Sequence, residues 1–63
     1  MRNQFIHTLS QEHQDKIKKA LIDYYKSIEI NEDEMPSLID EVMSDRVWIL
    51  EEGFPDLLLE LNL

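Results

Sequence analysis

Residues 40–52, which read DEVMSDRVWILEE, determine the fold. Arg46 and Trp48 stand in a segment that otherwise holds apolar and acidic residues and one serine. If a single helix runs through this segment, its apolar stripe comprises Met35, Leu38, Ile39, Val42, Met43, Ile49 and Leu50. Arg46 then falls in the middle of that stripe, and Trp48 lies roughly 160° away from it. The continuity of this helix therefore decides which way both side chains point.

Each arrangement gives the two residues different partners. On a continuous helix, the Arg46 stem packs inward while its head reaches an acid or the tail carboxylate, or the residue lies in a subunit interface. Trp48 is then either covered by the C-terminal leucines or used as an anchor for a partner. The third arrangement is a break at Ser44, which caps a new helix and rotates both residues to other faces.

The rest of the sequence favours helices over strands, because one glycine and two prolines provide too few turns for a sheet of several hairpins. Ser10 is a suitable N-cap, and the apolar spacing that follows it predicts a helix over about 11–28. Within this helix, His13 continues the apolar stripe and is interpreted as a packed or half-buried histidine.

The same kind of residue marks the two later helices. Pro36 suits a first helical position and Gly53 a left-handed C′ position, so a second helix is predicted over about 36–52 after an acidic turn. Asn31 with Glu34 forms a competing capping-box start. Pro55 begins a short helix over about 55–61, with an extended tail as the alternative.

These elements define an all-α fold, an antiparallel helical hairpin with a short C-terminal helix and an N-terminal arm, in one domain over residues 1–63. Phe5, Ile6 and Leu9 are expected to cover the open side of the hairpin as an extended arm or a short turn. The leucine-rich tail over residues 57–63 must pack on the hairpin or on another chain, because so much apolar surface is not left in water.

Charge is distributed unevenly along the 63 residues, whose formal net charge is −8. Residues 1–26 carry five basic and three acidic side chains, whereas residues 27–63 carry one basic and eleven acidic side chains. This balance repels nucleic acid and anionic membranes and favours a protein partner with a basic surface. No apolar run is long enough for a membrane span or a signal peptide, so a cytoplasmic location is expected.

The sequence offers little catalytic or metal-binding chemistry. It contains no cysteine, no glycine-rich phosphate loop and no serine, histidine and acid constellation. His7 and His13 are not spaced as a metal pair on one helix, and the acids of residues 31–34 lack the pattern of a calcium loop. We therefore expect no catalysis, no cofactor and no metal.

Two segments resemble a group of small proteins. They are residues 9–24, LSQEHQDKIKKALIDY, and residues 40–51, DEVMSDRVWILE. Together they resemble small acidic all-helical proteins of unknown function from phages and integrative elements of Gram-positive bacteria. The resemblance implies a protein that inhibits or redirects a host nucleic-acid enzyme by presenting carboxylates where phosphates would bind.

Two functions are open on this reasoning. The first is a non-catalytic acidic module that occupies a basic groove of a nucleic-acid-binding protein, with no direct nucleic-acid or membrane contact. Its expected contact residues are Glu32, Asp33, Glu34, Glu41, Asp45, Trp48, Glu51 and Glu52. The alternative is a structural or regulatory homodimer of paired hairpins with no nucleic-acid-mimic role, associating through Arg46, Leu57, Leu58 and Leu61.

Overall fold

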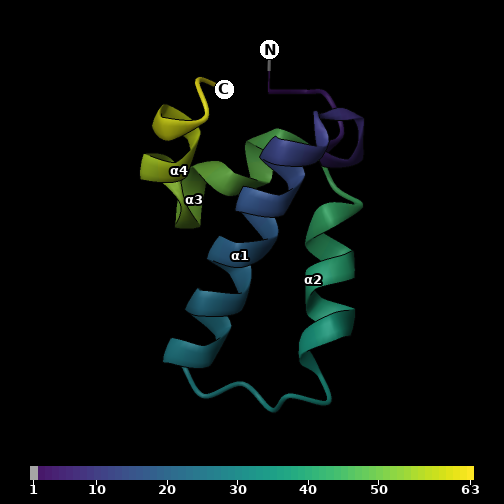
Figure 1. Ribbon diagram of the computed structural model, residues 1–63, viewed down its shortest axis with the longest axis vertical. Coiled ribbons are helices and arrows are strands. Elements are labelled where there is room, and N and C mark those ends of the chain that lie inside the picture. Colours follow the sequence, from purple (N-terminus) through teal and green to yellow (C-terminus); the bar gives the residue numbers. More distant parts are fainter. Residues whose placement is uncertain (1) are drawn as a thin grey trace.

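The computed structural model describes residues 2–63 of the chain (Figure 1). All of its regular elements are helical: η1 (Ile6–Thr8), α1 (Gln11–Ser27), α2 (Met35–Met43), η2 (Val47–Ile49), α3 (Leu50–Gly53) and α4 (Pro55–Glu60). Helices α1 and α2 lie side by side and antiparallel, and the short α3 and α4 pack across the end at which α1 begins (Figure 1). The predicted all-α class, hairpin, short C-terminal helix and N-terminal arm are confirmed.

Helix α1 forms where its cap and apolar spacing predict it. The Ser10 hydroxyl accepts a hydrogen bond from the His13 amide at 3.2 Å, which satisfies one of the free amides of the first turn. Its stripe places Ile17 and Leu21 in the core and leaves His13 half-buried, as predicted.

The α1–α2 linker contains the acidic turn that was predicted before the second helix. The Asn31 side chain accepts a hydrogen bond from the Asp33 amide at 3.0 Å, and the Asn31 carbonyl accepts one from the Glu34 amide at 3.0 Å. Glu34 makes no side-chain cap, so the competing capping box does not form. Helix α2 begins at Met35, with Pro36 in its first turn.

Two helix ends use a left-handed residue, and neither of them is glycine. After α1, Glu29 has φ 60°, and the Ile30 amide donates to the Tyr25 carbonyl at 3.0 Å. After α4, Asn62 has φ 59°, and the Leu63 amide donates to the Leu58 carbonyl at 2.9 Å. Both ends are Schellman motifs. The prediction that Gly53 occupies such a position is wrong, because Gly53 ends α3 without a positive φ.

Glu29 is the costlier of these residues, because glutamate has a Cβ that crowds the left-handed conformation, which asparagine tolerates better. We expect Glu29→Gly to raise the free energy of unfolding by about 0.5–1 kcal/mol, measured by urea denaturation. Lys19→Gly, within α1, is the control and is expected to lower it by about 1 kcal/mol. A loss of stability in Glu29→Gly would show that the left-handed residue carries no strain.

The predicted continuous helix over 36–52 is wrong, and the break lies at Ser44. Helix α2 ends at Met43, and the Ser44 amide donates to the Asp40 carbonyl at 3.0 Å. Arg46 is extended, with φ −88° and ψ 158°, and the Asp45 carboxylate accepts a hydrogen bond from the Arg46 amide at 2.7 Å. Ser44 does not cap a new helix as the third arrangement proposed. The Asp45 side chain instead provides the bond that competes with continuation of the helix.

The break changes which side chain enters the core. On a continuous helix the charged Arg46 would point inward, at the cost of burying its charge. After the turn, Val47 is fully buried and Arg46 is exposed. The turn therefore replaces a cation with an apolar residue in the core.

The N-terminal segment pairs with this turn. The Ile6 amide donates to the Asp45 carbonyl at 3.0 Å, the Val47 amide to the Gln4 carbonyl at 2.9 Å and the Trp48 amide to the Arg2 carbonyl at 2.9 Å. Phe5 and Arg46 form an isolated antiparallel bridge. Ile6 is fully buried, so the arm is part of the core as well as a cover for it.

Every helical element contributes to the core. Its buried members are Ile6, Ile17, Leu21, Met35, Ile39, Met43, Val47, Leu50, Leu58 and Leu61. The tail leucines Leu58 and Leu61 thus pack within their own chain, whereas Leu59 is 76% exposed.

Candidate functional site

The eight predicted contact residues lie in three places. Glu32, Asp33 and Glu34 occupy the linker, which lies at the opposite end of the α1–α2 pair from α3 and α4 (Figure 1). The second place holds Asp45 in the turn after α2, Trp48 in η2, and Glu51 and Glu52 on α3. Glu41 lies on α2 beside Tyr25. The molecule is 33 Å long, so the linker acids and the α3 acids do not form one patch.

The Trp48 surface, defined as Asp45, Trp48, Glu51 and Glu52, is the part that combines an apolar anchor with acids. Trp48 is 48% exposed, although the preceding Val47 is fully buried. Helix η2 runs directly into α3, so Glu51 and Glu52 follow Trp48 by three and four residues, on the same side of the helical segment. The amides of Val47 and Trp48 are both bonded to the N-terminal segment, which holds this side chain at the surface.

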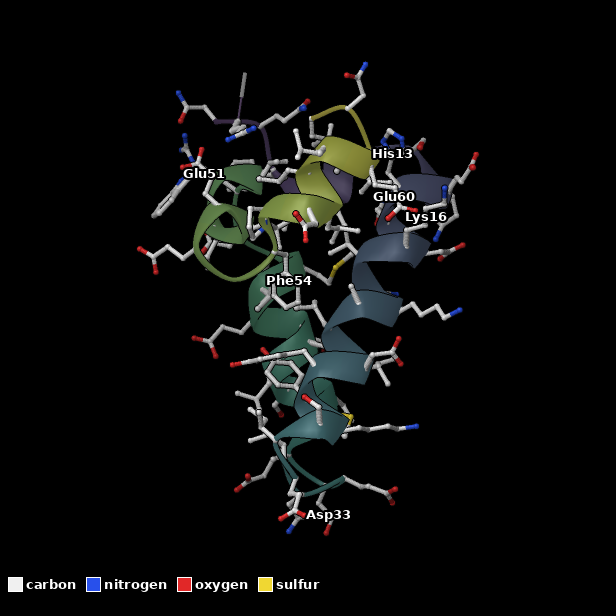
Figure 2. The ribbon with its side chains drawn as sticks, turned by 90° about the vertical axis from the view of Figure 1, so that its left-hand side faces the viewer. His13, Lys16, Asp33, Glu51, Phe54 and Glu60 are labelled. Carbon is white, nitrogen blue, oxygen red and sulfur yellow. The ribbon has the colours of Figure 1, made fainter. Side chains whose placement is uncertain are left out.

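The three acids of this surface differ in how free their charges are. Glu51 forms an ion pair with Arg2, whose Nη1 lies 3.1 Å from Oε1, and its side chain points outward (Figure 2). Asp45 is half-buried and accepts the Arg46 amide bond. Glu52 is exposed. Because the Arg2–Glu51 pair is solvent-exposed, it is worth little energy and a cationic partner can exchange with it.

Arg46 is not in the apolar stripe where a continuous helix would place it. Its guanidinium carbon lies 4.9 Å from the centre of the Phe5 ring, and His7 stacks on the same ring at 5.4 Å. The tail contact expected of Arg46 is made by Arg2, whose Nη2 donates to the Leu63 carbonyl at 3.2 Å. No local pattern of residues indicates this role of Arg2, because both of its partners are distant in the chain.

The residues predicted for self-association are also divided. Arg46 is exposed and Leu57 half-buried, whereas Leu58 and Leu61 are buried in the core of their own chain. The packing that the leucine tail requires is therefore largely provided within one chain.

Sequence reasoning missed an aromatic cluster that lies apart from Trp48. Tyr24 meets Phe54 edge to face at 5.5 Å and lies 5.6 Å from Tyr25. Burial raises the pKa of the Tyr25 hydroxyl above its ordinary value, and the nearby Tyr24 and Glu41 raise it further. Tyr24 continues the apolar spacing of Ile17 and Leu21 along α1, and this spacing gives no sign that α3 and α4 are too short to cover it.

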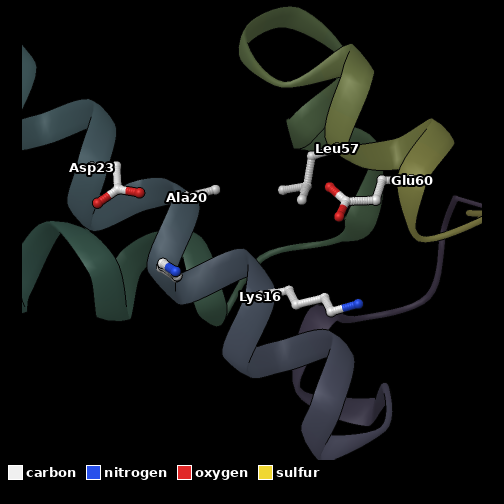
Figure 3. Close-up of a pocket in the computed structure, with 6 residues that line it drawn as sticks. Lys16, Ala20, Asp23, Leu57 and Glu60 are labelled. Carbon is white, nitrogen blue, oxygen red and sulfur yellow. The ribbon is translucent and has the colours of Figure 1, made fainter.

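A shallow groove of about 300 Å³ lies between α1 and α4 (Figure 3). It is lined by Lys16, Lys19, Ala20, Asp23, Leu57 and Glu60, which are mostly charged residues of both signs. Across residues 2–63, no three or more His, Cys, Asp or Glu side chains are grouped to hold a metal ion. No helix in the described part of the chain has the length and apolar character needed to cross a membrane.

Comparisons of the chain with protein-family models, with characterised proteins and with solved structures find no match.

Proposed function

We propose that the chain is a non-catalytic acidic protein-binding module that docks its Trp48 surface on a basic surface of a nucleic-acid-binding protein in the cytoplasm. The observation that carries this proposal is the half-exposed Trp48, which two acids follow within one helical turn. Its amide and that of Val47 are both bonded to the N-terminal segment. A large aromatic side chain held in place at the surface loses little conformational freedom on binding.

The surrounding charge sets the class of partner. Residues 27–63 carry eleven acids and one arginine, which attracts a cationic surface and repels a phosphate backbone. Tryptophan is enriched among the residues that dominate binding energy, and acids around it speed association and select a basic partner. The resemblance to phage and mobile-element proteins supports a groove that otherwise binds nucleic acid.

The homodimer of paired hairpins is the second proposal. The exposed Leu59 favours it, but the burial of Leu58 and Leu61 removes the main reason for it. Sedimentation at micromolar concentration distinguishes the two, since a monomer of 7.5 kDa excludes the homodimer.

The test is to capture binding proteins on the immobilised chain from a lysate of the cells in which the chain occurs. The affinity of the captured protein for the chain is then measured. We expect Trp48→Ala to weaken binding by about 30-fold, as loss of a central aromatic anchor does. The triple variant Asp45→Asn, Glu51→Gln and Glu52→Gln is expected to weaken it at least about tenfold and to reduce its salt dependence.

The matched control is the linker triple Glu32→Gln, Asp33→Asn and Glu34→Gln, which makes the same charge change at the other end of the molecule. We expect it to bind within about threefold of the unmodified chain, because surface charges this far apart are screened in physiological salt. Equal losses in the two triples would mean that net charge alone drives binding, and an unaffected Trp48→Ala variant would remove the anchor from the proposal.

A further inference from the structure

The half of the α1–α2 pair nearest the linker, the lower half in Figure 1, has an apolar face that no element within residues 2–63 covers. Ile17 and Leu21 of α1 are buried, but Tyr24 and Ile28, which continue the same stripe, are 47% and 48% exposed. Helices α3 and α4 cross only the upper half of the pair (Figure 1). We call the exposed part, formed by Tyr24, Ile28 and the edge of Phe54, the Tyr24 face.

Phe54 bounds the Tyr24 face at its upper end, and contacts between aromatic rings support it. Phe54, between α3 and α4, packs against the buried core, and Figure 2 shows it above the lower half of the helix pair. It contacts Tyr24 edge to face at 5.5 Å, and Tyr24 in turn lies 5.6 Å from Tyr25. The face is therefore an extension of the packed core along the helix pair, with aromatic rings at its upper end.

The charged residues beside this face are acidic. Glu41 of α2 lies close enough to Tyr25 to raise its pKa. Glu34, the N-cap residue of α2, precedes Glu41 by seven residues and so lies on the same side by helical spacing. Glu29 directly follows Ile28. Lys26 is two residues from both Tyr24 and Ile28, so on α1 it points roughly 160° away from them. Lys19 lies nine residues before Ile28 and also points to the opposite side.

We infer that the Tyr24 face binds an amphipathic helix of a partner protein, with lysine or arginine along its polar side. Such a helix would lay its apolar side on Tyr24, Ile28 and Phe54 and place its cations beside Glu41 and Glu29. A second copy of the chain would bring the same acids face to face, which opposes association. This surface shares no residue with the Trp48 surface, so the inference stands apart from the proposed function.

The experiment uses the whole chain, labelled with ¹⁵N, and a synthetic amphipathic helix built from leucine and lysine. We expect saturable binding in the micromolar range, with amide shifts centred on Tyr24, Tyr25, Ile28, Glu41 and Phe54. A peptide with glutamate in place of lysine is expected not to bind. Trp48→Ala is expected to bind the leucine–lysine peptide as the unmodified chain does, which separates this surface from the proposed function.

Ile28→Lys is expected to weaken peptide binding at least tenfold, and Glu41→Lys, which leaves the apolar contacts in place, at least threefold. The matched control Leu59→Lys places the same charge on another exposed apolar residue and is expected to change affinity by less than twofold.

Equal effects of Ile28→Lys and Leu59→Lys would overturn the inference, as would shifts confined to residues outside the face. Concentration-dependent shifts on this face without peptide would assign it to a second copy, and shifts there on addition of neutral lipid vesicles would assign it to a membrane. Either result would overturn the inference.

Discussion

Ile6→Ala is expected to lower the free energy of unfolding by about 3 kcal/mol, because it removes three carbons from a fully buried site. A core of this size stabilises a domain by only about 3–5 kcal/mol, so the variant would be close to unfolded at room temperature. This effect is large for a residue near the end of a chain, where side chains are often poorly ordered.

The measurement is urea denaturation followed by far-UV circular dichroism. Leu59→Ala is the control: Leu59 is exposed, so its truncation is expected to change stability by less than about 0.5 kcal/mol. If Ile6→Ala unfolded at the same urea concentration as the unmodified chain, the N-terminal segment would not belong to the core.

The N-terminal segment also connects stability to the proposed binding surface. Arg2 accepts the Trp48 amide bond through its carbonyl, and its side chain contacts Glu51 and the Leu63 carbonyl. A variant that detaches this segment would therefore release Trp48 from the position in which the proposed function requires it.

The parts of the fold that depend on local sequence were predictable. Ser10, the apolar spacing behind it and Pro55 each act within one or two helical turns, so they locate α1 and α4 to within a residue. The acidic turn before α2 follows from Asn31 and Pro36 in the same way.

The break at Ser44 depends on contacts between distant residues and was open in the sequence. The apolar spacing on either side of Ser44 fits a single helix. No nearby residue indicates that the carbonyls of Gln4 and Arg2 accept hydrogen bonds from the amides of Val47 and Trp48. The Asp45 side-chain bond is the local clue, but aspartate also occurs within helices. Tertiary pairing with the N-terminal segment decided the outcome.

The candidate site also combines features set by local sequence with features set by contacts between distant residues. Trp48 was expected to point outward on a continuous helix, and it is half-exposed for a different reason, because the turn directs the preceding Val47 into the core. The excess of acidic residues over residues 27–63 could be counted in the sequence. Its separation into a linker group and an α3 group required the fold, since it depends on where the helices end.

The chain turns at Ser44, which directs Val47 into the core and leaves Arg46 and Trp48 outside. Two single substitutions, compared with each other, distinguish this arrangement from a continuous helix. Val47→Asp would bury an unpaired carboxylate at a fully enclosed position, at a cost of several kcal/mol. Arg46→Asp would lose only an exposed contact with the Phe5 ring, worth about 1 kcal/mol or less.

The most direct measurement is the free energy of unfolding of these two variants, by urea denaturation with far-UV circular dichroism. We predict that Val47→Asp is unfolded without urea, whereas Arg46→Asp keeps a cooperative transition within about 1 kcal/mol of the unmodified chain. The opposite order, with Val47→Asp folded and Arg46→Asp unfolded, would show that Arg46 faces the core and that the chain does not turn at Ser44.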